Sequence, residues 1–315
     1  MPDFKILPLS LMKRWVLAVT AVLTLGFFFF FPPFAGEEIL VRVEKGESAK
    51  AVGRKLKDQG VIPSSTLFLV LASITGASRN IHYGPYQFEK NRTWKTVRKL
   101  ALGQTYSIKV SIPEGWAAYT IAQRLASEGI IQDAESFAAL VDERQLEGRL
   151  FPSTYFLEPG SDNETILNIF VNQFNKACPP EMRVSSAVLI LASIIEREAA
   201  ADDERPLISS VYHNRLKKRM PLEADPTVQY AIGKGRTWKE RVFYKDLKFK
   251  SPYNTYRNLG LPPGPICSPG LKSIQAALNP APTPYLYFVA DGAGRHQFFK
   301  DHKSHLLWQK QNRKK

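Results

Sequence analysis

Residues 110–140 read VSIPEGWAAYTIAQRLASEGIIQDAESFAAL, and residues 41–71, VRVEKGESAKAVGRKLKDQGVIPSSTLFLVL, align with them without gaps. The aligned positions include the pairs Gly46 and Gly115, Leu56 and Leu125, Gly60 and Gly129, and Phe68 and Phe137. Each copy has a short apolar stretch, a glycine, a helical pattern that ends at the second glycine, and another helical pattern. The sequence therefore predicts a duplicated unit of a strand, a turn and two helices.

The segment between the two copies predicts further elements. GPYQFEK (84–90) is typical of an edge strand, and TWKTVRKLALG (93–103) is typical of a helix. The first copy with this strand has the order strand, helix, helix, strand, and in that order it resembles a LysM-like module. That resemblance implies binding to glycans that contain N-acetylglucosamine, whereas the alternative is an α+β spacer without a ligand.

The composition indicates a globular protein. The chain has 315 residues, of which 44% are hydrophobic and 23% charged, and its formal net charge is +14. This charge suits nucleic acid, anionic lipid or an acidic polymer equally well. The two cysteines, Cys178 and Cys267, have no metal-type spacing, so we expect neither a zinc site nor a disulfide framework, although one optional disulfide stays open.

One stretch near the N-terminus favours a membrane span. Residues 15–36 contain no ionisable side chain, and their apolar core is long enough to cross a bilayer. A cleaved signal peptide is the alternative, but the apolar run is long for one and PPFAG is a poor cleavage site. Basic residues before the span and Glu37 and Glu38 after it predict a cytoplasmic N-terminus and an exported remainder, which argues against nucleic acid as a partner.

These patterns predict an α+β protein with four parts. We expect a cytoplasmic N-terminus (1–14), a single transmembrane helix (15–36), a small LysM-like α+β module (37–107) and a larger α+β catalytic domain (108–315).

A helix that ends in two glutamates is the first candidate site. LASIIEREAA (191–200) is apolar on nearly every face until Glu196 and Glu198, which point to nearly opposite sides of a helix. Glu196 continues the stripe through Ser193, and Glu198 continues the stripe through Ile194 and Ile195. A helix C-terminus and an apolar wall both raise the pKa of a carboxyl group, as a general acid requires. The plain alternative is a solvated helix end.

Two downstream segments argue for a functional site. LEADPTVQYAIG (222–233) and SPYNTYRNLGLPPGPICSPG (251–270) hold tyrosine rings and amides on proline-rich loops, which suits a sugar groove. The candidate substrate residues are Asp225, Thr227, Gln229, Tyr253, Asn254 and Tyr256, each with loop packing as its alternative.

With NPAPTPYLYFVADGAGRHQF (279–298), these motifs and the apolar N-terminal stretch resemble the membrane-anchored endolytic murein transglycosylases, the YceG-like family. The resemblance implies that Glu196 alone cleaves the β-1,4 bond between N-acetylmuramic acid and N-acetylglucosamine within peptidoglycan strands. It would protonate the glycosidic oxygen and then take the proton of the C6 hydroxyl, leaving 1,6-anhydro ends that terminate or trim nascent strands. The resemblance further implies an inner-membrane location and peptidoglycan synthases (penicillin-binding proteins) as partners, with no cofactor and no metal.

Two alternatives stay open. With Asp225 as a second carboxylate, the protein is a muramidase that hydrolyses the bond. Without catalysis, it is a membrane-tethered glycan-binding scaffold. The histidines His213, His302 and His305 favour surface or packing roles over a metal site, and His296 follows a predicted hairpin turn and can reach the groove edge.

Overall fold

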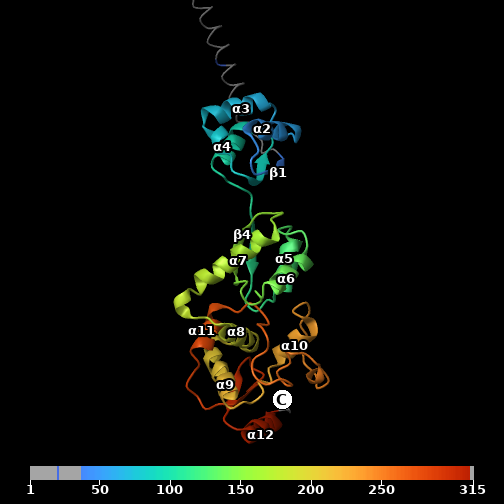
Figure 1. Cartoon of the computed structure of the whole chain (residues 1–315), viewed down its shortest axis with the longest axis vertical. Coiled ribbons are helices and arrows are strands. Elements are labelled where there is room, and N and C mark those ends of the chain that lie inside the picture. The colour runs from blue at the N-terminus through green and yellow to red at the C-terminus, as the bar shows by residue number, and fades with distance from the viewer. Residues whose placement is uncertain (1–19, 21–36, 313–315) are drawn as a thin grey trace, which may run out of the picture. The chain divides into compact units, whose positions relative to one another are not determined.

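The computed structural model describes Thr20 and residues 37–312 of the chain (Figure 1). The chain divides into two compact units between Ser107 and Ile108. Each unit mixes helices with one or more two-stranded sheets, in agreement with the predicted α+β class. The predicted anchor, residues 15–36, lies outside the described residues apart from Thr20. Among the described residues, no helix is both long and apolar enough to cross a membrane.

The first unit is built on an antiparallel pair of strands with helices between them. Its elements are β1 (Glu38–Val43), α2 (Ala49–Asp58), α3 (Ser65–Ile74), the short 3-10 helix η1 (Ala77–Arg79), β2 (Gly84–Glu89) and α4 (Thr93–Ala101). Strands β1 and β2 pair with Val41 opposite Tyr86. Their inner side chains pack with the apolar faces of the helices in one core that contains Leu56, Phe68 and Leu100.

The second unit begins with the same plan. Its first elements are β3 (Ile108–Ile112), α5 (Ala118–Ser127), α6 (Ala134–Glu143), β4 (Ser153–Leu157) and α7 (Asn163–Ala177). Strand β3 pairs antiparallel with β4, and Val110 lies opposite Tyr155. A separate core fills this part of the unit around Ile121, Phe137 and Phe170.

The duplication extends beyond the two segments that the sequence aligned. Helices α5 and α6 begin and end at the positions that match the ends of α2 and α3, and both glycine turns have positive φ in both copies. The second strand is also repeated, since Tyr86 and Tyr155 occupy matching places in their sheets. Each of these buried tyrosines donates its hydroxyl hydrogen to the backbone carbonyl four residues earlier, that of His82 or Phe151. The repeated unit is therefore strand, helix, helix, strand, helix.

The rest of the second unit surrounds one buried helix, α8 (Ser186–Glu198). The remaining elements are η2 (Pro180–Met182), η3 (Asp202–Glu204), α9 (Arg205–Lys217), α10 (Asp225–Gly233), η4 (Asp246–Lys248), α11 (Leu271–Leu278), β5 (Tyr287–Ala290), β6 (His296–Phe299) and α12 (His302–Asn312). Helix α8 packs against α9, α10 and α11 (Figure 1). Strands β5 and β6 form the predicted hairpin, with Ala290 opposite His296.

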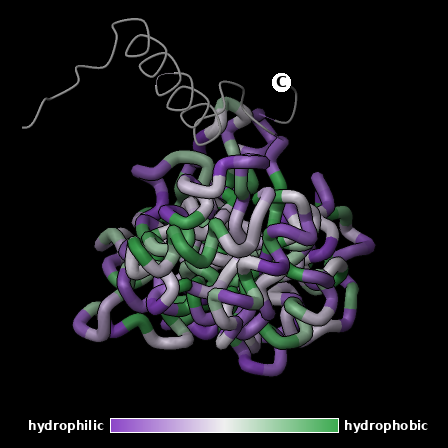
Figure 2. Tube along the Cα trace, turned by 90° about the horizontal axis from the view of Figure 1, so that it is seen from above, coloured by the Kyte–Doolittle hydropathy of each residue, from purple (hydrophilic) through white to green (hydrophobic). Residues whose placement is uncertain are grey.

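Apolar residues of α8 and of the loop before α11 form the core of this region. It contains Leu189, Ile194 and Ile195 from the helix and Ile266 and Cys267 from the loop. Hydrophobic and hydrophilic stretches alternate over short distances along the chain (Figure 2), as expected where each element has one buried and one solvated side. Cys178 and Cys267 are both free thiols, so the optional disulfide is not formed.

Candidate active site

Helix α8 is fixed along its whole length before it reaches the glutamates. Ser185 caps its start by accepting a hydrogen bond from the amide of Val188 (3.3 Å), and residues 189–195 are buried. The hydroxyl of Ser193 bonds to the carbonyl of Ile190 (2.7 Å) and accepts the amide of Ile266 (3.0 Å). The helix end is therefore held both by its own core and by the proline-rich loop.

Glu196 is engaged on both carboxylate oxygens. Its Oε1 pairs with Nη1 of Arg205 (3.1 Å), and its Oε2 accepts the amide hydrogen of Gly270 (2.8 Å). The side chains of Glu196 and Arg205 are only 6% and 10% exposed. A carboxylate held in this way ties α8 to α9 and to the start of α11, and both of its oxygens are engaged within the protein. The expected catalytic role of Glu196 does not fit these contacts.

Glu198 lies on the opposite side of the helix, as the helical spacing predicts, and faces a cavity of about 350 Å³. The hydroxyl of Tyr212 donates to its Oε1 (3.0 Å), and Oε2 has no protein partner in the part of the chain that the structure describes. Burial raises the pKa of Glu198 to about 7, and the negative charge of Asp225 acts in the same direction. Near neutral pH this carboxyl group therefore exists in both the acid and the base form.

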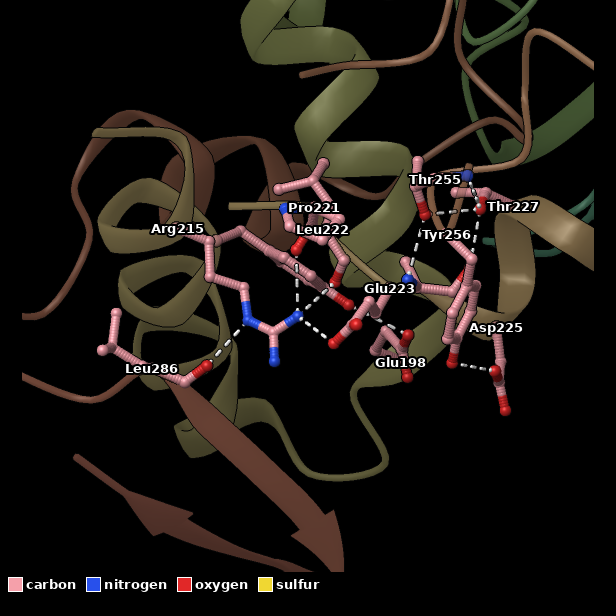
Figure 3. Close-up of polar contacts among 12 residues, drawn as sticks. Glu198, Arg215, Pro221, Leu222, Glu223, Asp225, Thr227, Thr255, Tyr256 and Leu286 are labelled. Carbon is pink, nitrogen blue, oxygen red and sulfur yellow. Dashed lines mark hydrogen bonds and ion pairs between the residues drawn. The ribbon is translucent and has the colours of Figure 1, made fainter. Parts of the chain in front are cut away.

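The cavity brings three carboxyl groups, aromatic rings and two histidines together. Its lining residues are Glu198, Tyr212, Arg215, Leu222, Glu223, Asp225, Tyr256, Phe288, Val289, Ala290, His296, His305 and Gln309. Figure 3 shows Glu198 between the Arg215 and Glu223 pair on one side and the Tyr256 and Asp225 pair on the other. The hydroxyl of Tyr256 donates to Asp225 (2.7 Å), and Arg215 donates to Glu223 (2.8 Å).

Arg215 holds the cavity wall together. Its Nη1 donates to the carbonyls of Pro221 (3.0 Å) and Leu222 (3.1 Å), and its Nε donates to the carbonyl of Leu286 next to β5 (2.7 Å). The guanidinium group thus joins the segment before α10 to the hairpin strand (Figure 3). Through these bonds Arg215 positions the wall of the cavity.

The predicted substrate residues separate into three groups. Asp225 and Tyr256 line the cavity with Glu198, as a substrate role requires. Thr227 and Asn254 are 0% exposed and bond inside the protein, so they hold the loop and offer no surface to a substrate. Thr227 pairs with the hydroxyl of Thr255 (2.9 Å), and Asn254 donates to the carbonyls of Leu247 and Phe249.

The other two predicted residues lie elsewhere. The amide of Gln229 donates to the carbonyl of Lys239, which closes the loop after α10. Tyr253 lines a second cavity with Tyr230, and the centroids of the two rings are 4.9 Å apart. Sequence order alone placed Tyr253 and Tyr256 together, but they point into different cavities.

His296 is held at the cavity by a contact that the sequence pattern did not indicate. It is the first residue of β6, and Glu204, which is 2% exposed, binds both its backbone amide (3.0 Å) and its Nδ1 (2.8 Å). A carboxylate on Nδ1 fixes the ring and leaves Nε2, which has no protein partner within the described residues, available to the cavity. The DDE sequence at 202–204 gave no sign of this pairing, because the two residues come from distant segments.

The glycine turn of the second copy also meets the site. The amide of Gly115 donates to the carbonyl of Ser268 (2.9 Å), and the amide of Ser268 donates to the carbonyl of Trp116 (2.8 Å). Glu114 lies so close to Gly270 that a Cβ at Gly270 would be 1.9 Å from its Oε1. Burial, followed by the charge of Glu196, raises the pKa of Glu114. The loop before α11 thus rests on the duplicated unit.

No metal centre emerges among the residues that the structure describes, where no three His, Cys, Asp or Glu side chains are grouped as metal ligands. The rings of His302 and His305 lie beside Tyr287 on the hairpin, with centroid distances of 5.4 and 5.5 Å. Burial lowers the pKa of His305, which favours its neutral form. His213 bonds to the carbonyl of Ala277 (3.0 Å) and joins α9 to α11.

The second unit is thus an α+β unit in which a carboxyl group, that of Glu198, faces a cavity lined by further carboxylates, aromatic rings and histidines. The YceG-like family matches residues 41–311, and the chain belongs to this family. An endolytic murein transglycosylase of Bacillus subtilis is 37% identical over 299 residues, which cover 84% of this chain and 82% of the relative.

Two further comparisons agree. An endolytic murein transglycosylase of Streptococcus pneumoniae is 27% identical over 300 residues, covering 80% of this chain and 54% of the relative, so the chain spans about half the length of that protein. The crystal structure of a yceG-like protein from Listeria monocytogenes matches with a TM-score of 0.55 and 31% identity, over 87% of this chain and 100% of that one.

Proposed function

We propose that this protein is an endolytic murein transglycosylase in which Glu198 is the catalytic acid and base. Glu198 gives its proton to the glycosidic oxygen, and the bond between that oxygen and C1 of N-acetylmuramic acid breaks. The C6 hydroxyl of the same sugar bonds to C1, and its proton passes to the Glu198 carboxylate. The products are a free N-acetylglucosamine 4-hydroxyl and a 1,6-anhydro end, and the carboxyl group returns to its starting form.

The observation that carries this proposal is the difference between the two glutamates of α8. Glu198 has one oxygen free toward a cavity and a pKa near neutrality, while both oxygens of Glu196 are bound. The same helix end therefore has one glutamate suited to proton transfer and one suited to holding structure. The names of the relatives from Bacillus and Streptococcus support the substrate.

The other cavity residues have binding roles in this proposal. Asp225 and Tyr256 bind sugar hydroxyl groups, and the rings of Tyr256 and Phe288 offer apolar faces to the sugar rings. His296, fixed by Glu204, accepts a hydrogen bond at Nε2 from the attacking hydroxyl and directs it toward C1. His296 is thus a substrate-orienting group, and Glu198 makes both proton transfers.

Two rival functions use the same site differently. A muramidase would use Asp225 to activate water, and the position of Asp225 on the Glu198 cavity is the observation in its favour. Because the hydroxyl of Tyr256 donates to Asp225, we favour sugar binding for this carboxylate. A scaffold that only binds glycan would not require a carboxyl group with a pKa of about 7 facing a cavity.

The location and partners are part of the proposal. The apolar stretch 15–36, after basic residues, favours a single-pass anchor in the bacterial inner membrane with the catalytic unit outside the cytoplasm. The strand, helix, helix, strand order of 37–107 is compatible with a LysM-like, glycan-binding role. Peptidoglycan synthases are the expected partners of an enzyme that cuts nascent strands.

Mass spectrometry of the products tests the reaction. Purified residues 37–315 are incubated with peptidoglycan strands, and we expect internal cuts with 1,6-anhydro ends. Reducing ends would overturn transglycosylation in favour of hydrolysis, and uncut strands that still bind would favour the scaffold. The Glu198→Gln variant, with unchanged circular dichroism, is the control that ties the cuts to this site.

A further inference from the structure

A second cavity, of about 390 Å³, lies in the same unit and is not part of the catalytic site described above. It is lined by Ala118, Tyr119, Ala138, Asp142, Glu147, Tyr230, Ala231, Lys234, Arg236, Ser251 and Tyr253. Its volume is in the range of small-ligand pockets. None of these residues lines the Glu198 cavity. The lining combines aromatic rings with charges of both signs, which indicates a ligand that is itself charged.

The inner part of this cavity is acidic and aromatic. Glu147 accepts the amide hydrogen of Ala118 at both oxygens (3.1 and 3.2 Å), and the hydroxyl of Tyr230 lies 3.4 Å from its Oε2. Burial raises the pKa of Glu147 to about 7. Tyr230 and Tyr253 supply ring faces, whereas the ring of Tyr119 is already covered by Arg236, whose Cζ lies 4.2 Å from its centroid. Because both of its oxygens are bound, Glu147 holds the cavity wall, and the carboxylate of Asp142 near the rings of Tyr230 and Tyr253 is the one in a typical environment for an ammonium group.

The rim of the cavity has two exposed groups of opposite charge. Asp142 and Lys234 both line the cavity, and neither has an ion-pair partner in the described part of the chain. The third charged group, Arg236, is already bound by Glu135 through two contacts of 2.5 and 2.6 Å. Lys234 is therefore the cation of this cavity that remains open to a carboxylate, and Asp142 is the carboxylate that remains open to an ammonium group.

The two cavities share two segments of the chain. Helix α10 begins at Asp225, which lines the Glu198 cavity, and contributes Tyr230 and Ala231 to the second cavity. Asp225 and Tyr230 are five residues apart on this helix, which is about 7.5 Å along its axis at about 1.5 Å per residue. Likewise Tyr256 faces the first cavity and Tyr253 the second. About 7.5 Å is the span of about two extended residues at about 3.3–3.6 Å each.

We propose that the second cavity binds the stem peptide of the glycan substrate, with a free primary ammonium group between the rings of Tyr230 and Tyr253 and the carboxylate of Asp142, and a peptide carboxylate at Lys234. This inference rests on the proposed function, because the peptide is joined to the muramic acid that is cut at Glu198. It names the substrate class more closely: the enzyme cuts strands that carry peptides with a free amine and discriminates against bare strands.

The test compares three glycan substrates: strands with native peptides, strands whose peptide amines are acetylated, and strands stripped of peptides. We expect the kcat/KM of the wild-type protein to be at least about tenfold higher on the native strands, which corresponds to about 1.4 kcal/mol. In Lys234→Asn and Asp142→Asn this ratio falls toward one. Asparagine is chosen at position 234 because that residue has a positive φ of 47°.

Lys250→Asn is the matched control, since Lys250 is an exposed lysine that does not line the cavity, and it should keep the wild-type ratio. A wild-type ratio near one, or an unchanged ratio in Lys234→Asn, overturns the proposal. A ratio near one together with thermal stabilisation by free L-lysine, lost in Asp142→Asn, would assign the cavity to a free amino acid and also overturn it. Failure to cut any strand would instead contradict the proposed function.

Discussion

The two copies of the duplicated unit have the same backbone plan and different surroundings. In the first copy, Ser48 caps α2 with its own side chain, which accepts the amide hydrogen of Ala51 (3.2 Å). The matching residue in the second copy is Ala117, whose side chain cannot cap α5. There the carboxylate of Glu147, 29 residues away, bonds to the amide of Ala118. The second copy has replaced a local cap by a tertiary one.

The glycine turns differ in the same way. In the first copy, the turn beside Gly46 has Glu47, which pairs with Lys55 (2.6 Å), and a Cβ at Gly46 would meet nothing within 4 Å. In the second copy, the turn at Gly115 bonds to Ser268 and lies against Glu196 and Arg197. An ordinary surface turn has thus become a support for the loop of the catalytic unit. The two copies therefore share a backbone plan, and the residues that surround the second copy make its turn a support for the catalytic site.

The largest expected effect concerns the two glutamates of α8, which lie in the unit that contains the second copy. Glu198→Gln should lower the cleavage rate about 10²–10⁴-fold, because glutamine cannot give up a proton, without lowering Tm. Glu196→Gln should instead lower stability, by about 3 kcal/mol, because it breaks a buried pair with Arg205. Product analysis and thermal unfolding of both variants check this; loss of catalysis only in Glu196→Gln would return the catalytic role to that residue.

The pH dependence of the cleavage rate also tests whether Glu198 is the catalytic acid. Burial raises the pKa of Glu198 to about 7, and the reaction begins with its protonated form. We expect kcat to fall as pH rises through about 7, since the acid form is then lost. A rate profile at fixed saturating substrate measures it; a rate that rises steadily through this range would contradict Glu198 as the acid.

His296 gives the next effect in size. His296→Ala should lower kcat by about 10–100-fold with a smaller change in KM, because the attacking hydroxyl loses its orienting acceptor. Glu204→Gln should have a weaker effect in the same direction, since it disturbs only the ring position. His302→Ala is the matched control on α12, because His302 does not line the Glu198 cavity. Equal rates in His296→Ala and His302→Ala would exclude the role.

A pair of glycine variants compares the two copies directly. Gly46 and Gly115 both have positive φ, of 85° and 78°, so alanine at either position should cost about 1–2 kcal/mol of stability. Only Gly115→Ala should also lower the cleavage rate, because that turn supports the loop at Ser268. Unfolding curves and cleavage rates of the two variants are measured side by side. A similar loss of cleavage rate in Gly46→Ala would contradict a special role of the Gly115 turn.

The smallest effects concern the two helix caps. Ser48→Ala should lower stability by about 1 kcal/mol at every pH. The Glu147 cap behaves differently, because its pKa is raised in the folded state from an ordinary 4.5 to about 7, so its contribution is full below about pH 4.5 and is lost as pH rises through about 7. Glu147→Gln should flatten this part of the stability profile in thermal unfolding, and an unchanged profile would contradict the raised pKa.

Local patterns predicted much of the fold. Glycine positions and helical periodicity located α2, α3, α5 and α6, and the capped apolar pattern located α8, because these signals lie within one turn or one face of an element. The second half of the duplication was missed. Beyond the aligned segments the two copies share few side chains, such as Tyr86 and Tyr155. Both copies nevertheless continue with a strand and a helix, so the repeat is visible in the backbone and not in the sequence.

The sequence by itself determined that Glu196 and Glu198 point to opposite sides of α8, since helix geometry fixes the angle between them. Its own pattern also contained the clue to Glu198, which continues the stripe through Ile194 and Ile195, both 0% exposed. Only the tertiary structure decided which glutamate faces Arg205 and Gly270 and which faces Asp225, Tyr256 and His296. These partners come from segments far apart in the chain, and the pKa of a carboxyl group depends on the charges and burial that they provide.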